Sequence, residues 1–383
     1  MTMRLVADET IRMLRESAGR CFADLDTVRL LRRHRDARDL DALSRGVWEQ
    51  MVPLGLPGIL IGEDQGGSGL GFRESVQVSE MMGRALATGP FLSTAVMAAT
   101  AIGHGGNARL QRELLPAIVA GTTIVSVAGE ERQRHAPADI ATLARRSGDS
   151  WLISGRKLAV IDANIAGRLI VVARDDEAPE KLLLLLVHAA AAGVHWKAAM
   201  GLDSHPHCTV ELGDVRAAAD DLICAPEHTG ALLDRIYDAG RLHLAAEMLG
   251  LASEAFDRTV DYLKTRTQFG RKIGEFQGLQ HRAAILFGEI EIAASVVLKA
   301  ATLHDAGDPR FPAFASLAKA KAGEVARHVT AEAVHLHGGI GMTDDFDMGF
   351  YLKRVRTAAE RLGDTSYHQQ RWLALSSVSG API

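Results

Sequence analysis

The sequence predicts an α+β protein of several domains, with helical regions on either side of a β-rich middle. In residues 1–121 and 228–383, apolar residues recur every three or four positions, as on one face of a helix. In residues 122–227, short apolar runs alternate with turn residues and no long helical pattern intervenes. We therefore expect an N-terminal helical domain, a middle antiparallel β-barrel or sandwich, and a C-terminal helical bundle. The 383 residues suffice for two or three domains, each on the order of 100–200 residues.

The N-terminal region begins with a helix signal at Asp8-Glu9-Thr10, which places Ile11, Leu14 and Ala18 on one face. The glycine-rich segment 65–71 interrupts the helical spacing. We expect this segment to be a flexible loop. Helical spacing resumes near Val76.

The middle region contains four strand candidates. Residues 151–161 read as two strands that meet near Gly155, and further strands are expected over 169–172, 182–187 and 209–212. The C-terminal region then contains two long amphipathic helices. Their apolar positions run from Leu242 to Leu263 and from Leu317 to Leu336.

The composition excludes several classes of protein. Lysine and arginine total 43 against 47 aspartate and glutamate, a net charge of −4, so no basic excess exists to bind a nucleic acid. Three widely separated cysteines argue against a disulfide framework and fit a reducing compartment. The acidic start is unlike a signal peptide, and no apolar run approaches the ~18 residues of a membrane helix. We expect a cytoplasmic protein without a membrane span.

Two short motifs are set aside. Residues 103–108 imitate a dinucleotide-binding fingerprint but follow a helical stretch rather than a strand. His205-Pro-His207-Cys208 resembles a set of metal ligands, yet no second ligand pair stands at zinc spacing. A turn with two exposed imidazoles and no metal is expected there.

The segment 262–282 is more informative, because it joins basic residues, amides, an aromatic ring and glycines at the end of a long helix. Arg266 can bind a diphosphate in a forked geometry, and Phe269 can stack on a flat base. Gln277 and Gln280 lie three residues apart and share a helix face. The alternative is an ordinary basic helix end, whose cations satisfy the last carbonyl groups.

The segment 335–343 contains three glycines after a helix, which is more than a helix stop needs. Its exposed backbone amides can approach a phosphate closely. The alternative is a helix C-cap followed by a turn.

Together these stretches resemble the acyl-CoA dehydrogenase family along nearly the whole chain. The resemblance rests on five motifs in order, including Arg266-Thr-Gln-Phe-Gly270 with Gln277 and His337-Gly-Gly-Ile-Gly341. The other three are Gly55-Leu-Pro-Gly and Glu63-Asp-Gln-Gly-Gly67, at the two ends of one stretch, and Gly155-Arg-Lys157. Locally, Glu131-Arg-Gln133 and Leu362-Gly-Asp-Thr365 are most similar to the smaller subunit of pimeloyl-CoA or steroid-side-chain dehydrogenases.

The resemblance implies a four-helix C-terminal bundle, FAD as cofactor and an acyl-CoA thioester as substrate. In this family a carboxylate removes the α-proton, and the β-hydrogen leaves as hydride to the flavin. The nucleotide end of the flavin reaches a neighbouring subunit, so these proteins are usually tetramers. By resemblance, the cofactor-binding residues are Arg266, Gln268, Phe269, Gln277, His335, Gly338, Gly339 and Thr365. His335 stands where the family usually has glutamine.

The chain departs from the family at the catalytic base. The family places a glutamate at one of two positions, which correspond here to Gly240 and Gly363. Asp364 and Glu360 are candidates for a relocated base. A helix-capping role in a Gly-Asp-Thr turn explains Asp364 more simply.

The flavin-ring motifs depart as well. The family's Thr-Glu-Pro is replaced by Glu130-Glu131-Arg132, and its Trp-x-Thr is replaced by Ala159-Val-Ile161. A carboxylate beside the ring would oppose the charge of reduced flavin by about 1 kcal/mol or more.

These losses cluster at the base and the ring, while the nucleotide-side motifs remain. We hypothesise that the chain is the base-lacking subunit of an unlike pair, such as a heterotetramer of lipid or steroid catabolism. A homologous acyl-CoA dehydrogenase subunit would supply the base. The alternatives are a self-sufficient enzyme with a relocated base, a relative with chemistry that needs no α-proton base, and a structural or regulatory homotetramer without flavin.

Overall fold

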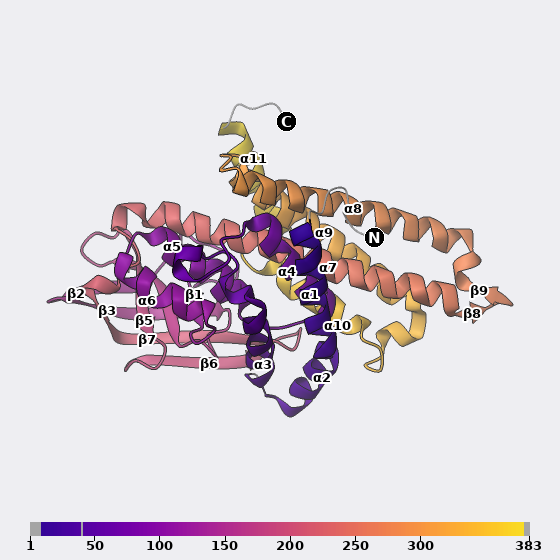
Figure 1. The fold of residues 1–383 in the computed structure, drawn as a ribbon, viewed down its shortest axis with the longest axis horizontal. Helices are drawn as coiled ribbons and strands as arrows, with labels where there is room; N and C mark the ends of the chain where they lie inside the picture. Colours follow the sequence, from indigo (N-terminus) through magenta and orange to yellow (C-terminus); the bar gives the residue numbers. More distant parts are fainter. Residues whose placement is uncertain (1–8, 40, 379–383) are drawn as a thin grey trace. The chain divides into compact units, whose positions relative to one another are not determined.

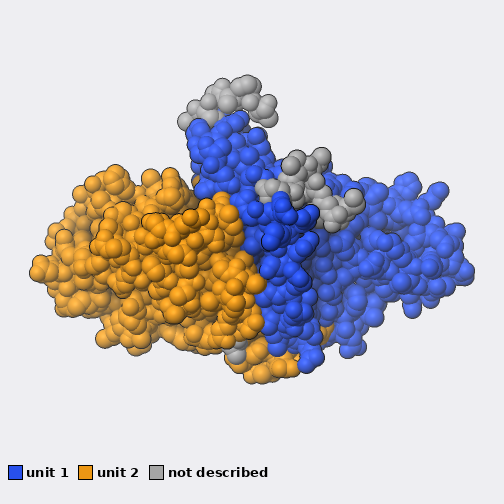
Figure 2. Space-filling model, in the orientation of Figure 1, with its two compact units in different colours: residues 1–30, 72–87, 241–383 blue, residues 31–71, 88–240 orange. Residues whose placement is uncertain are grey.

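The computed structural model describes residues 9–39 and 41–378, and Figure 1 shows their helices and strands. Its contacts divide the chain into two compact units, coloured separately in Figure 2. Unit 1 comprises residues 1–30, 72–87 and 241–383, and unit 2 comprises residues 31–71 and 88–240.

Unit 1 is helical. Besides the first turn of α2 (Thr27–Ala37), it contains α1 (Glu9–Asp24), α4 (Phe72–Ala85), most of α7 (Thr229–Thr265), the hairpin β8 (Thr267–Gln268) and β9 (Arg271–Lys272), α8 (Gln277–Asp305), α9 (Phe311–His337), α10 (Met348–Glu360) and α11 (Thr365–Val378). The expected helix at the N-terminus is confirmed as α1, which buries Ile11, Ala18 and Phe22 on one face. The two long C-terminal helices are confirmed as α7 and α9.

Helices α4 and α7 of unit 1 pack with their backbones in direct contact. A Cβ atom on Gly83 would lie 2.1 Å from the carbonyl oxygen of Glu247, and one on Gly250 would lie 2.0 Å from that of Glu80. Both positions therefore require glycine, which has no Cβ atom.

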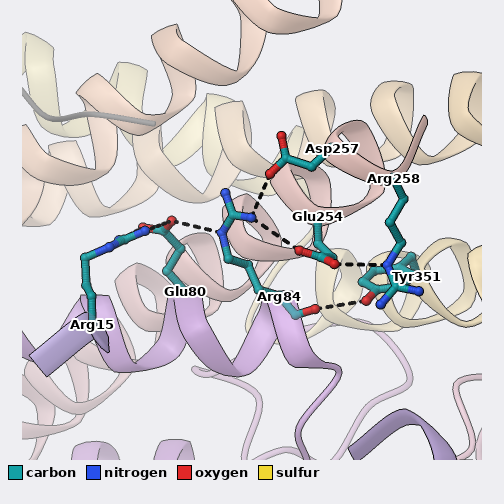
Figure 3. Close-up of polar contacts among 7 residues, drawn as sticks. All are labelled: Arg15, Glu80, Arg84, Glu254, Asp257, Arg258 and Tyr351. Atoms are coloured by element: carbon teal, nitrogen blue, oxygen red, sulfur yellow. Dashed lines mark hydrogen bonds and ion pairs between the residues drawn. The ribbon is translucent and has the colours of Figure 1, made fainter. Parts of the chain in front are cut away.

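Charged side chains reinforce this contact (Figure 3). Arg84 of α4 donates to Asp257 at 2.9 Å and to Glu254 at 3.3 Å, both on α7. Glu80 pairs with Arg15 of α1 at 2.7 Å, and the Tyr351 hydroxyl of α10 donates to the Arg84 carbonyl at 2.9 Å. One network thus joins four helices.

Unit 2 holds the sheet. Its helices are the rest of α2, α3 (Ala42–Met51), the π-helix Phe91–Ala98, α5 (Ala99–Gly105), α6 (Ala108–Val119) and the start of α7. Its strands are β1 (Val125–Ala128), β2 (Leu143–Ser147), β3 (Ser150–Val160), β4 (Arg168–Asp175), β5 (Leu182–His188), β6 (Val194–Met200) and β7 (Pro206–Ala218).

The strand order is β1-β4-β2-β3-β7-β6, and β5 pairs with β4. The strands expected over 169–172, 182–187 and 209–212 are confirmed within β4, β5 and β7. The sheet is not purely antiparallel, because β4 pairs in parallel with β1 and β2. Residues 150–160 form one strand rather than two, since the β3–β7 pairing continues through irregularities at Gly155 and before Val160.

The glycine-rich segment 65–71 is compact rather than a flexible loop. The amides of Gly67, Ser68 and Gly69 donate to the carbonyls of Gly62, Gly58 and Ile61, at 2.8–3.1 Å. These bonds fold the segment back on the short 3-10 turns that precede it.

Candidate functional site

A short β-hairpin lies between the end of α7 and the start of α8. Strands β8 and β9 pair across the two-residue turn Phe269-Gly270, in which both residues have positive φ, +53° and +79°. This geometry is typical of a type I′ turn, which favours glycine at its second position. Phe269 occupies the first position and is 88% exposed, so its ring is presented to solvent.

Arg266 stands at the base of this hairpin. Its carbonyl accepts from the amide of Ile273 at 2.9 Å, which fixes its backbone. The side chain is exposed, and among the described residues it forms no hydrogen bond or ion pair. By contrast, Arg271 lies over the ring of Phe276 at 4.0 Å. Arg266 is therefore available to an anionic ligand.

The start of α8 and the end of α9 lie next to this hairpin. Arg282 of α8 donates to Glu332 at 2.7 Å and lies 2.9 Å from Nδ1 of His335, both on α9. At the end of α7, the ring of Tyr262 lies 4.5 Å from that of His337. Gln277, the first residue of α8, is exposed at the same end.

The turn after α9 exposes its backbone. Gly338 has a φ of +66°, and a Cβ atom on Gly338 or Gly339 would meet nothing within 4 Å. A hollow of about 250 Å³ lies beside the turn, and its lining includes Gly341, Phe346 and Lys353. The Gly338 amide donates to the His335 carbonyl, so the expected helix C-cap is confirmed, while contact with a phosphate stays a prediction.

Unit 1 thus brings seven of the expected cofactor residues to one end of the bundle: Arg266, Gln268, Phe269, Gln277, His335, Gly338 and Gly339. Thr365 is not among them. Its hydroxyl lies beside Gly323 in the middle of α9. Fifteen residues separate Gly323 from Gly338, or ~22 Å along the helix. Thr365 therefore lies away from the glycine turn of its own chain, and its cofactor role stays a prediction.

The nucleotide end of FAD fits this cluster by its chemistry. An unpaired guanidinium, an exposed aromatic ring and open glycine backbone are the groups that bind a diphosphate and a flat base.

Gly363, where the family's glutamate is expected, has no room for a side chain. Its φ is +110°, and a Cβ atom there would lie 2.5 Å from Cδ1 of Tyr367 and 2.8 Å from Nε2 of His368. The other expected position, Gly240, is a buried residue within α7. Neither position carries an acid, and Gly363 is also sterically closed.

The two candidates for a relocated base lie close to Gly363 in sequence. Asp364 Oδ1 accepts from the amide of Tyr367 at 2.8 Å, the arrangement of a cap on α11. Glu360 is exposed at the end of α10.

Buried basic side chains hold the backbone around Gly363. Lys319 Nζ donates to the carbonyls of Ala359 at 2.9 Å and Gly363 at 3.2 Å. Arg241 Nε and His368 Nε2 lie 3.4 Å and 3.0 Å from the Leu362 carbonyl. Burial lowers the pKa of Lys319 to about 7. Sequence reasoning missed this group, although a lysine inside an alanine-rich buried stripe of α9 was a visible signal.

The two glutamates expected beside the flavin ring are engaged within unit 2. Glu131 Oε1 lies 2.5 Å from Lys157 Nζ, and Glu131 accepts from the amides of Ala141 and Thr142. Glu130 lies 2.5 Å from Nδ1 of His135. Burial alone would raise the pKa of Glu131, but the hydrogen bond and charge of Lys157 outweigh it and lower the pKa. Burial lowers the pKa of Lys157 to about 8. The Glu131 carboxylate is therefore paired with Lys157, and its place beside a flavin ring stays a prediction.

The turn at His205-Pro-His207-Cys208 and the other described residues show no metal site. His205 is buried rather than exposed, with Nδ1 2.8 Å from the Asp203 carbonyl. Over residues 9–39 and 41–378, no cluster of histidine, cysteine, aspartate and glutamate is arranged to hold a metal ion. No helix in that same part of the chain is long and apolar enough to cross a membrane.

Comparison with known proteins adds independent information. FadE12, an acyl-CoA dehydrogenase of Mycobacterium tuberculosis, is 32% identical over 320 residues, which are 82% of each chain. The 3-sulfinopropanoyl-CoA desulfinase of Paraburkholderia xenovorans is 31% identical over 79% of this chain and 80% of its own. Among solved structures, a variant of the Tcur3481-Tcur3483 steroid ACAD has a TM-score of 0.87 at 32% identity, over 98% of this chain and 99% of that one. Butyryl-CoA dehydrogenase from Megasphaera elsdenii shares the fold, with a TM-score of 0.91 at 21% identity over 98% and 100%.

Family models match in chain order. The acyl-CoA dehydrogenase N-terminal domain matches residues 8–122, the middle domain residues 127–215 and the C-terminal domain residues 232–371. The chain belongs to the acyl-CoA dehydrogenase family, whose members are FAD-dependent oxidoreductases.

Proposed function

We propose that this chain is the base-lacking subunit of a heteromeric acyl-CoA dehydrogenase. The observation that carries the proposal is the closure of Gly363 by Tyr367 and His368, because it removes the place for a side-chain base. An unlike, homologous subunit would supply the glutamate and the flavin-ring pocket. The relative described as a steroid ACAD favours a steroid or lipid acyl-CoA as substrate.

The contribution of this chain would be to hold the nucleotide end of an FAD whose ring lies in the partner. Arg266 would bind the diphosphate, Phe269 would stack on the adenine, and the amides of Gly338 and Gly339 would approach a phosphate oxygen. Gln268, Gln277 and His335 would line the same groove. Thr365 would contact a different part of the ligand, since it lies in the middle of the bundle. The bound FAD supplies hydride acceptance; these residues supply binding and orientation.

The experiment is to purify the chain alone and measure flavin absorbance and acyl-CoA dehydrogenation. We expect neither stoichiometric FAD nor turnover, and both should appear when the unlike subunit is added. Stoichiometric FAD with unaided turnover would contradict the proposal and favour a self-sufficient enzyme with a relocated base. A flavin-free homotetramer that never gains activity would favour a structural or regulatory role.

A second candidate is acyl-CoA chemistry that needs no α-proton base. The relative described as a 3-sulfinopropanoyl-CoA desulfinase favours it, because that name denotes loss of sulfinate rather than dehydrogenation. Sulfite release from a 3-sulfinoacyl-CoA by the isolated chain would distinguish this candidate from the first.

A further inference from the structure

One face of the sheet in unit 2 carries a row of three side chains across β2, β3 and β7. Arg145 of β2 lies directly opposite Leu152 of β3, which lies directly opposite Arg216 of β7. Residues directly opposite on neighbouring strands point to the same face. Ile153, the next residue of β3, belongs to the buried core, so the row points away from that core. Both arginines are exposed. We call these three residues the sheet row.

The two positive charges of the sheet row are not neutralised within the chain. Among the residues that the structure describes, neither guanidinium forms a hydrogen bond or an ion pair. Asp214 stands two residues before Arg216 on β7, but its carboxylate accepts from the Ser154 hydroxyl at 2.8 Å. The row therefore presents two cations on a chain whose net charge is −4.

Other arginines of the same strands do have partners. Arg174 of β4 donates to the Ile140 carbonyl at 3.0 Å. The guanidinium of Arg146, the next residue after Arg145, lies over the ring of Trp151 at 4.4 Å. The arginines of the sheet row differ in that their guanidinium groups remain available to another molecule.

The spacing of the sheet row indicates the form of the partner. Neighbouring strands lie about 4.8 Å apart, so the backbones that carry Arg145 and Arg216 are ~10 Å apart. On an extended strand, residues of one face recur every ~6.7 Å, which does not match this distance. On an α-helix, residues seven apart lie ~10.5 Å apart on nearly the same face, which does match. A residue three or four positions after the first would then meet Leu152.

The composition of the sheet row favours carboxylates over a charged polymer. The forked guanidinium of arginine binds a carboxylate through two parallel hydrogen bonds. Leu152 separates the two cations, and Leu143, two residues before Arg145 on β2, is 41% exposed. A polyphosphate carries charge along its whole length and offers no apolar side chain to these leucines. A protein helix offers both kinds of group.

The sheet row is separate from the flavin motifs in sequence and along β3. Leu152 is the third residue of β3, whereas the segment Ala159-Val-Ile161 begins at the other end of the strand. Seven residues of strand span ~23 Å. We infer that the sheet row binds a helix of a partner protein that carries two carboxylates seven residues apart, with an apolar residue between them.

The test uses the full chain and a fluorescein-labelled, alanine-rich helical peptide with two glutamates seven residues apart and a leucine four residues after the first. Fluorescence anisotropy at low salt should show saturable binding that weakens as salt is raised. Arg145→Gln/Arg216→Gln should weaken binding by at least about tenfold, because both charged contacts are lost. Arg145→Lys/Arg216→Lys should lose less, because the charge remains without the forked geometry.

Two controls assign the binding to the sheet row. Arg112→Gln/Arg134→Gln removes the same charge from two other exposed positions of unit 2 and should leave the affinity unchanged. A peptide with glutamines in place of both glutamates should not bind.

Three results would overturn the inference. They are the absence of saturable binding, an equal loss of affinity in both arginine-to-glutamine double variants, and tighter binding of inorganic polyphosphate through the same two arginines. The last result would make the row a polyanion site. The readout involves neither flavin nor turnover, so its outcome is separate from that of the proposed function.

Discussion

The ammonium group of Lys319 lies 3.2 Å from the carbonyl oxygen of Gly363, the residue at which the family's base is expected. The interaction ties α9 to the loop between α10 and α11, and burial sets the Lys319 pKa at about 7. The folded chain therefore releases this proton near pH 7, whereas an unfolded lysine keeps it to about pH 10.4.

The first prediction follows from that difference. Between these pH values the unfolded state binds more protons, so Lys319 makes the free energy of unfolding rise with pH, by at most ~1.4 kcal/mol per pH unit. Urea titrations at pH 7, 8 and 9 should show a smaller rise for Lys319→Met than for the unmodified chain. Equal slopes would mean that Lys319 stays charged when folded.

The second prediction concerns the buried pair of Glu131 and Lys157. Glu131→Gln leaves the Lys157 charge without its counter-ion and should cost about 3–5 kcal/mol of stability. Folding lowers the Glu131 pKa, so ionised Glu131 contributes to the free energy of unfolding at pH values above the ordinary carboxyl pKa. This contribution is lost as the pH falls through the pKa of Glu131 in the folded chain. Asp139→Asn, which breaks the exposed pair with Arg132, is the control and should leave the urea midpoint unchanged.

The third prediction concerns the network that joins α1, α4, α7 and α10 (Figure 3). Arg84→Met removes the group that Glu254 and Asp257 share and should destabilise unit 1 by about 3 kcal/mol. Tyr351→Phe removes only the hydroxyl bond to the Arg84 carbonyl and should cost about 1 kcal/mol. Arg12→Met, on the exposed side of α1, should have no effect on chemical denaturation. Equal losses in all three variants would show that the network carries no specific stabilisation.

The fourth prediction separates backbone strain from crowding at Gly363. In Gly307→Ala the new Cβ atom has no neighbour within 4 Å. The variant should therefore lose only the energy of placing alanine in a left-handed conformation, about 1–2 kcal/mol of stability. Gly363→Ala should cost more, because the new methyl group meets the Tyr367 ring, and Tyr367→Ala should recover part of the loss. Gly363→Glu should gain no dehydrogenase activity. A stable, active Gly363→Glu variant would refute the closure of this position.

The fifth prediction tests the cofactor role of Arg266. In the assembled enzyme, Arg266→Ala should release FAD on gel filtration, because the diphosphate loses its guanidinium partner. Lys264→Ala changes a cation two residues away that lies 3.8 Å from Asp261, and should retain the flavin. Retention of flavin by both variants would argue against the assignment.

Periodicity predicted the helices well because a long amphipathic face repeats its signal over many turns; the regions of α7 and α9 were located from Leu242–Leu263 and Leu317–Leu336 alone. It failed at β3, where Gly155 read as a break although cross-strand bonds to β7 carry the strand through it. The prediction of a flexible loop at 65–71 was also wrong. The segment is rich in glycine, but backbone hydrogen bonds to Gly58 and Ile61 hold it in one conformation.

The polar interior was harder to predict than the helices. The contact of Glu131 with Lys157 spans 26 residues, and no local pattern encodes it. The same holds for Lys319, whose partners are carbonyls 40 and 44 residues away. Local motifs did indicate that Arg266 and Phe269 lie close together, because they are near neighbours in sequence; their cofactor role stays a prediction. The position of Thr365 beside Gly323 could not be predicted in this way, since a motif indicates the type of ligand but not the distance between helices.

Phe269 holds a left-handed backbone conformation that phenylalanine seldom adopts, at the tip of a hairpin closed by its own main chain. The fold itself thus directs the ring outward. If Phe269 stacks on the adenine as proposed, the conformational free energy of this arrangement is spent when the chain folds and does not weaken binding. Asn or Gly at this position would relieve the backbone strain of the turn, but either would also remove the aromatic ring. The strained turn and the exposed ring therefore depend on the same residue.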